Sequence, residues 1–172
     1  MPPPSLRTDR LVLHAPSPPD LEDMAAMWGD PGVYEMIGGR AFTREEVWQR
    51  LLRYIGHWQV CGYGTLIVRE PGGAFVGSVG LMDSRRDTDP SFEGRPEVGW
   101  ALSPAMHGRG YALEALQAVL GWADGQGLAS TVCIIDAANA RSIRLAERVG
   151  FTPSAPVIYR AKPILLFERS IS

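Results

Sequence analysis

The chain has 172 residues, of which 45% are hydrophobic and 21% charged, which is typical of one folded domain with a substantial core. With 17 basic and 19 acidic residues its formal net charge is −2, so nothing indicates a nucleic-acid partner or a charged tail. No apolar run approaches the roughly 20 residues that a membrane helix needs, and the N-terminus has no apolar signal core. We therefore expect a single cytoplasmic domain over residues 1–172 that does not bind membranes.

Neither the cysteines nor the histidines are spaced for a metal site. Cys61 and Cys133 are too few for a disulfide scaffold, and no Cys-x-x-Cys is present. His14, His57 and His107 do not have metal-ligand spacing. We expect no metal, and we interpret both cysteines as buried small hydrophobes.

The first half of the chain predicts two helices and three strands. Ser17-Pro-Pro-Asp20 combines a cap, prolines in the first turn and an acid, which is typical of a helix start. Thr43-Arg-Glu-Glu46 has the spacing of a capping box. The expected order is a strand at 10–15, a helix at 17–28, a helix from 43 to the glycines at 62 and 64, and strands at 65–68 and 74–82. The polar segments 29–42 and 83–95 are expected to be loops.

The second half alternates strands and helices. We expect strands at 97–102, 131–135 and 164–167, and helices at 110–125 and 142–149. Gly150 suits the left-handed residue that ends a helix. The pattern as a whole predicts an α/β mixture whose first half is largely antiparallel.

The segment 97–114 predicts a strand, a tight turn and a helix start. Its turn, His107-Gly-Arg-Gly-Tyr-Ala112, contains two glycines that let the backbone approach a bulky anion. The following helix has free N–H groups and the positive end of its dipole at this point, which favours a phosphate or pyrophosphate. Arg109 either adds charge at the rim or points to solvent. A glycine turn with a purely structural role is the competing interpretation.

Two other nucleotide motifs fit this segment poorly. A P-loop needs Gly-Lys-Ser/Thr at the helix start, which the sequence lacks. A dinucleotide fingerprint needs a third glycine where Leu113 stands, within an opening strand–helix–strand unit.

The segment resembles the acetyl-CoA motif of the GNAT acetyltransferase superfamily, Gln/Arg-x-x-Gly-x-Gly/Ala. Gly110 and Ala112 match its last two positions, whereas His107 departs from the first. The run 108–115 is similar to the branch that includes acetyltransferases of ribosomal-protein N-termini. Leu6-x-Thr-x-Arg-Leu-x-Leu13 and Asn139-x-x-Ser-Ile-Arg-Leu-x-Glu-x-x-Gly-Phe151 extend the resemblance over nearly the whole chain.

The resemblance implies a fold and a cofactor site. The fold is an α/β (α+β) GNAT fold: a central mixed, mostly antiparallel sheet, splayed between two central strands and flanked by helices on both faces. Acetyl-CoA is the implied cosubstrate, with its pantetheine arm held by backbone around Trp100 and Leu102. Its pyrophosphate would be held by N–H groups of the phosphate loop, and Asn139 would contact the pantetheine. The phosphate-loop residues are Gly108, Arg109, Gly110, Tyr111, Ala112 and Leu113.

The resemblance also implies direct attack of a neutral primary amine on the thioester. Glu97 is the candidate base, with Glu93 and Asp83 in reserve; a solvated edge carboxylate is the alternative for Glu97. Many GNAT enzymes place a proton-donating tyrosine where this chain has Ala146. Ser142 is the candidate donor, or else simply a residue of the first helical turn.

The acceptor is a small-molecule or peptide amine whose identity the sequence does not indicate. Tyr34, Met36 and Phe42 suggest an apolar wall, and Glu35 would attract a cation. A CoA-binding sensing or regulatory module without turnover is the alternative function, and a homodimer is compatible with the resemblance. Tyr111 is expected to pack under the helix start rather than to contact the acceptor.

Overall fold

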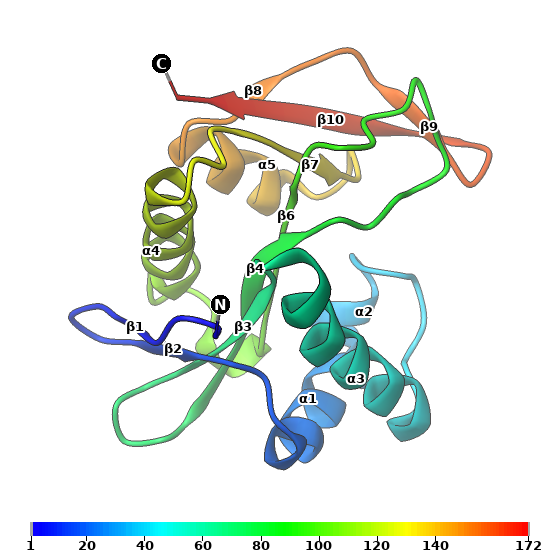
Figure 1. Cartoon of the computed structure of the whole chain (residues 1–172). Coiled ribbons are helices and arrows are strands. Elements are labelled where there is room, and N and C mark those ends of the chain that lie inside the picture. The colour runs from blue at the N-terminus through cyan, green and yellow to red at the C-terminus, as the bar shows by residue number, and fades with distance from the viewer. Residues whose placement is uncertain (1, 172) are drawn as a thin grey trace.

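One twisted sheet organises the computed structural model, which describes residues 2–171 (Figure 1). The strand order is β1-β2-β3-β4-β6-β7-β10-β9-β5, with β8 paired to β10. The strands are β1 Leu6–Arg7, β2 Val12–His14, β3 Thr65–Arg69, β4 Phe75–Met82, β5 Thr88–Asp89, β6 Glu97–Leu102, β7 Ser130–Ile135, β8 Thr152–Pro153, β9 Val157–Tyr159 and β10 Lys162–Ser170. The helical segments are η1 Pro18–Asp20, α1 Leu21–Trp28, α2 Pro31–Tyr34, α3 Arg44–Cys61, η2 Pro104–Met106, α4 Tyr111–Gly125 and α5 Ala140–Arg148.

The two central strands β6 and β7 separate along their length. They form the one parallel pair among the described strands, and their register contains a single residue pair, Glu97 with Val132. All other described strand pairs are antiparallel. The sheet is therefore mixed, mostly antiparallel and splayed at its centre, as expected from the sequence.

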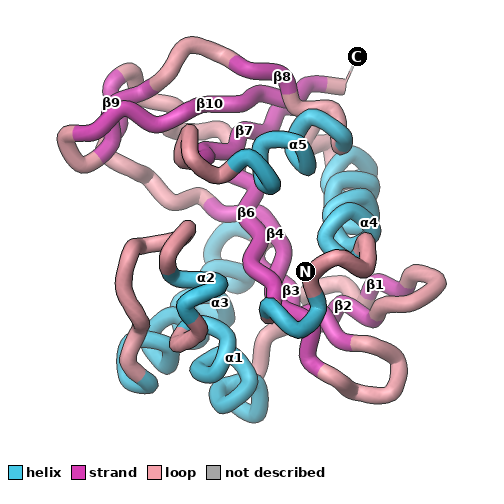
Figure 2. The backbone as a smooth tube through the Cα atoms, turned by 180° about the vertical axis from the view of Figure 1, so that it is seen from behind, coloured by secondary structure: helices cyan, strands magenta, loops and turns pink. Residues whose placement is uncertain are grey.

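Helices cover both faces of the sheet (Figures 1 and 2). On one face α4 and α5 pack over β6, where Val98 and Leu102 belong to a core with Leu116 and Ala146. On the other face α1 and α3 pack around Ala101 of the same strand. Because side chains alternate along a strand, β6 thus presents its even-numbered residues to α4 and α5 and its odd-numbered residues to α3.

Local sequence explains the bounds of the long helix α3. Thr43 accepts a hydrogen bond from the Glu46 N–H, and the Glu46 carboxylate accepts one from the Thr43 N–H, which completes the expected capping box. Gly62 ends the helix in the left-handed conformation with φ 72°. The buried stripe of α3 is Val47, Leu51, Tyr54 and Trp58.

Several short elements depart from the sequence expectations. The expected loop 29–42 contains α2, which begins because Pro31 follows Asp30 and the Asp30 side chain accepts from the Gly32 N–H. The expected loop 83–95 contains β5, which pairs with β9 about 70 residues later, and β10 is longer than 164–167 because it pairs with β7, β8 and β9. Long-range pairing of this kind has no local signal.

Within residues 2–171, no helix combines the length and the apolar character that a membrane span requires.

Candidate acetyl-CoA site

The loop before α4 presents a row of free backbone N–H groups. Gly108 and Gly110 have φ of 75° and 77°, a conformation that favours glycine, and they turn the chain from η2 into α4. Within residues 2–171, no backbone or side-chain acceptor takes a hydrogen bond from the N–H groups of positions 108 to 113. Since the positive end of the α4 dipole lies at the same place, the loop suits a phosphorylated ligand.

The edge of β6 that faces β7 also has no strand partner over its second half, where the Leu102 carbonyl oxygen lies 3.0 Å from His107 Nε2. The Val132 N–H donates to Pro96 O at 3.0 Å, and the Ser103 N–H donates to Val76 O on the β4 side at 2.9 Å. Because backbone groups alternate between the two edges, the peptide groups of Trp100 and Leu102 face the gap to β7. Their position next to the phosphate loop matches the path expected for a pantetheine arm.

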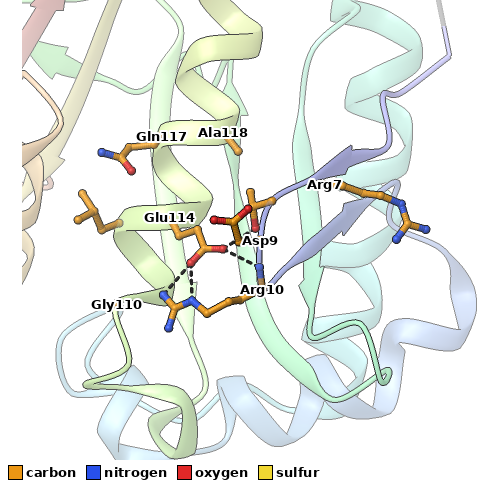
Figure 3. Close-up of a pocket in the computed structure, with 9 residues that line it drawn as sticks. Arg7, Asp9, Arg10, Gly110, Glu114, Gln117 and Ala118 are labelled. Carbon is orange, nitrogen blue, oxygen red and sulfur yellow. Dashed lines mark hydrogen bonds and ion pairs between the residues drawn. The ribbon is translucent and has the colours of Figure 1, made fainter.

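An ion pair from the N-terminal hairpin supports the phosphate loop (Figure 3). The Arg10 guanidinium donates to Glu114 Oε2 at 2.7 Å and to the Arg109 carbonyl at 2.8 Å. Thr8 donates to Glu114 Oε1 at 2.6 Å. Partial burial raises the pKa of the Glu114 carboxyl, but the hydrogen bonds from Thr8 and Arg10 outweigh it and leave the pKa below its ordinary value. The motif at 6–13 thus contacts the motif at 108–115, a relation that the sequence did not reveal.

This ion pair lies in the wall of a hollow of about 580 Å³ between the β1–β2 hairpin and α4. Figure 3 shows Gly110 at one end of the hollow and Gln117 and Ala118 further along the helix. Leu113 also lines it. Of the predicted phosphate-loop residues, Gly110 and Leu113 therefore border a surface depression.

Tyr111 packs under the start of α4, as predicted. Its side chain belongs to the main core, the residue is 8% exposed, and the ring lies 4.7 Å from the Arg10 guanidinium. Its hydroxyl donates to Glu70 at 2.6 Å, and this hydrogen bond raises its pKa. Arg109 also reaches toward Glu70 at 3.5 Å with half of its side chain exposed, so it lies at the rim of the loop.

The start of α5 faces the same gap. Asn139 caps the helix, because its side-chain oxygen accepts from the Ser142 N–H at 3.1 Å. The Ser142 hydroxyl accepts from the Trp100 indole N–H at 3.3 Å. Arg141 lies 2.7 Å from His107 Nδ1, and His107 Nε2 lies 3.0 Å from the Leu102 carbonyl oxygen. Arg141 was not predicted; an arginine in the first turn of a helix has no distinctive sequence signal.

Glu97 is buried in an ion pair rather than exposed at a strand edge. It is 4% exposed, and both of its oxygens accept hydrogen bonds from Arg86, at 2.7 and 2.9 Å. Ser84 also donates to it. Arg86 in turn donates to the Tyr159 hydroxyl at 3.0 Å. The solvated-edge alternative for Glu97 is therefore wrong, and the carboxylate is occupied in this state.

The reserve carboxylates lie near a second arginine. Asp83 and Glu93 approach Arg85 at 3.3 and 3.7 Å, and Glu93 is well exposed. In the 29–42 segment, Phe42 packs edge-on against Trp28, while Glu35 and Met36 are exposed. Among residues 2–171 no group of three or more histidine, cysteine, aspartate or glutamate side chains is arranged to hold a metal.

Comparison with known proteins agrees with the geometry of the loop and the splayed strands. The family described as the acetyltransferase (GNAT) domain matches residues 10–152, and the chain belongs to this family. It is similar to a solved protein from Bordetella pertussis assigned to the GnaT acetyltransferases, with 34% identity, a TM-score of 0.85, and coverage of 97% of this chain and 99% of that one. It is also 28% identical to the uncharacterized protein YkkB of Bacillus subtilis (strain 168), over 95% of this chain and 94% of that protein.

A more distant structure shares the fold. The aminoglycoside acetyltransferase AAC(6′)-Ib, solved in complex with coenzyme A, has a TM-score of 0.77 at 15% identity, with 93% of this chain and 94% of that chain covered.

Proposed function

We propose that this protein transfers the acetyl group of acetyl-CoA to a primary amine of a peptide N-terminus or a small molecule. The observation that carries the proposal is the row of free N–H groups at positions 108 to 113, which continues into the free edge of β6. A phosphorylated and extended ligand would satisfy the hydrogen-bonding groups of both the loop and the strand edge. Acetyl-CoA supplies an activated acetyl thioester when bound.

The residues present fit this cosubstrate. Backbone N–H groups of Gly108, Arg109, Gly110, Tyr111, Ala112 and Leu113 would hold the pyrophosphate. A Cβ at Gly108 would meet no atom within 4 Å, so the surface of the loop is open at that point. Trp100 and Leu102 would bind the pantetheine through their backbone, and Asn139 keeps its amide N–H₂ available beyond its capping role. The His107–Leu102 hydrogen bond would have to open for an arm to pair along β6.

Ser142 is the proposed proton donor to the departing thiolate. Its oxygen accepts from Trp100, so its own proton stays free to donate. Replacing Ser142 with alanine should lower kcat by about 10²–10⁴-fold if it acts as an acid. An unchanged kcat would restrict Ser142 to its place in the helix start.

The surroundings of Glu97 favour an acceptor that arrives neutral. As a base, this carboxylate would have to take a proton while Arg86 competes for both of its oxygens. An α-amine, with a pKa of about 7.7–8.0, is roughly a tenth neutral at pH 7, whereas a lysine amine of pKa about 10.4 is almost fully charged. We therefore propose a peptide-like α-amine as the acceptor, in keeping with the resemblance of residues 108–115 to N-terminal acetyltransferases.

The pairing of Glu97 with Arg86 also supports the alternative function, a CoA-binding module without turnover. The carboxylate expected to act as the base is paired, and the position of the usual tyrosine donor is Ala146, which is fully buried.

Thermal unfolding with acetyl-CoA, NAD and ATP, each added separately, tests the cofactor. A ligand at about 100 times its dissociation constant should stabilise the fold by about 2.7 kcal/mol, a rise on the order of 5–10 °C for a chain of this size. A shift with acetyl-CoA alone supports the proposal, and release of free CoA in the presence of amines then separates an enzyme from a binding module. No shift, at a concentration that stabilises a control acetyltransferase, would mean that the loop is only a turn.

A further inference from the structure

An arginine cluster lies on the α3 face of β6. Its members come from three segments: Arg50 and Arg53 from α3, Arg86 from the β4–β6 connection, and Arg160 from the β9–β10 turn. Arg86 and Arg160 both stack on Tyr159, with guanidinium carbons 5.1 and 5.0 Å from the ring centroid. The tertiary structure thus brings Arg86 close enough to Arg50 and Arg53 to repel Arg53, while Arg160 shares the Tyr159 ring with Arg86.

The negative charge near this cluster is too small to balance it. Glu97 pairs with Arg86. Across residues 2–171, no carboxylate comes within ion-pair distance of Arg50, Arg53 or Arg160. By contrast, Arg44, the remaining arginine of α3, is paired with Glu22.

The effect of this unbalanced positive charge is clearest in the pKa of Arg53. Its environment lowers its pKa, through burial first and then through repulsion by Arg50 and Arg86, with Tyr54 opposing the shift. The side chain is nevertheless solvent-accessible, so a dissolved ligand can reach it. Arg50 is held in place by the faces of Trp28 and Phe42, 4.2 and 4.9 Å from their centroids.

The Arg86–Glu97 end of the cluster lies on the face of β6 opposite to the Trp100 side chain. Trp100, whose backbone would hold the pantetheine, directs its side chain to Ser142 of α5. Glu97, three residues earlier, directs its side chain to the opposite face, where Arg86 meets it. A cosubstrate entering beside α4 and α5 leaves this α3 face open to the second substrate.

We propose that the acceptor amine also carries a negatively charged group, foremost a carboxylate, which Arg53 binds with the help of Arg50. The inference rests on the proposed acetyl transfer and specifies its substrate class. It disfavours polycationic amines such as the aminoglycosides named for the distant structural relative. It also reverses the expectation that Glu35 selects a cation.

Four dipeptide amides with N-terminal serine test the proposal, since they differ in the second side chain while the attacked amine stays nearly constant. The second residues are aspartate, asparagine, lysine and phosphoserine. A charge-assisted hydrogen bond predicts kcat/KM about 10- to 100-fold higher for Ser-Asp than for Ser-Asn, mainly through KM. The Ser-Asp preference should weaken as ionic strength rises. A phosphoserine peptide that exceeds Ser-Asp would identify phosphate rather than carboxylate as the bound anion.

The Arg53→Gln variant should reduce the ratio of Ser-Asp to Ser-Asn to near one. Arg44→Gln is the matched control, because Arg44 lies on the same helix and is exposed and paired with Glu22, away from the cluster. Equal kcat/KM for Ser-Asp and Ser-Asn, a preference for Ser-Lys, or a ratio unchanged in Arg53→Gln would overturn the proposal while leaving acetyl transfer intact.

Product binding separates this inference from the proposed function. Titration calorimetry with CoA and the N-acetylated forms of Ser-Asp and Ser-Asn amide needs no turnover. Tighter, Arg53-dependent binding of the acidic product supports the anion site even if no acetyl transfer is detected. Equal binding of the two products would count against it whether or not the enzyme is active.

Discussion

The ion pair between Glu97 and Arg86 allows a structural role to be separated from a catalytic one. Replacing Glu97 with glutamine keeps the side-chain shape but leaves the Arg86 charge without its partner. Breaking a buried pair costs about 3–5 kcal/mol. Because a quarter of the Arg86 side chain is exposed and water can solvate the charge, we expect a smaller loss of about 2–3 kcal/mol.

This loss is measurable by thermal or urea unfolding. At about 2–4 °C for each kcal/mol in a chain of this size, the melting temperature of Glu97→Gln should fall by about 4–12 °C. The double variant Glu97→Gln/Arg86→Gln removes both charges and should recover much of the stability, with a coupling free energy of about 1–3 kcal/mol.

Activity of the same variants then decides the role of Glu97. If Glu97 is the base, the double variant regains stability but remains about 10²–10⁴-fold slower than the parent protein. If Glu97 only neutralises the Arg86 charge, activity recovers together with stability in the double variant. A Glu97→Gln protein with unchanged stability would refute the reasoning, because the buried carboxylate would then contribute nothing to holding Arg86.

Three further perturbations test the loop, a helix cap and the partly buried ion pair between Arg169 and Asp124. Gly108→Ala and Gly127→Ala each place a side chain at positive φ in open space, so each should lower the stability of the fold by about 1–2 kcal/mol. Only Gly108→Ala should also reduce the stabilisation by acetyl-CoA. Equal reductions in the two variants would contradict the assignment of the loop. Thr43→Ala removes the α3 cap and should cost about 1 kcal/mol in urea unfolding, and no loss would mean that water replaces the cap. The hydrogen bond from Arg169 lowers the pKa of Asp124, so its contribution is present above the unfolded pKa near 4 and is lost as pH falls through the folded pKa. The stability difference between the parent protein and Asp124→Asn should accordingly be present at pH 7 and shrink towards pH 3, whereas a constant difference would argue against the pair.

Local signals were sufficient to predict the helix ends and the glycine turn before α4. The capping box at Thr43 and Glu46 and the glycine at 62 act within one turn of the chain, so their neighbours in sequence are also their partners. Gly108 and Gly110 likewise indicated a turn that needs positive φ, and the helix after them supplies the free N–H groups. The position of β6 was read correctly from the same segment.

Only the tertiary structure showed how the site residues pair. The sequence made Glu97 a candidate base, with a solvated edge carboxylate as the alternative. In the structure it is paired with Arg86, 11 residues away, and Arg86 also donates to Tyr159, which lies beyond two further strands and two helices. Arg10 reaches Glu114 across 104 residues. The attraction between two charges depends on their distance in space. Spacing along the sequence indicates that distance only within a helix or a turn. The chain therefore determined by itself where its loop and helices begin, while the fold decided which charges are neutralised and which, like Arg53, remain without a carboxylate among the described residues.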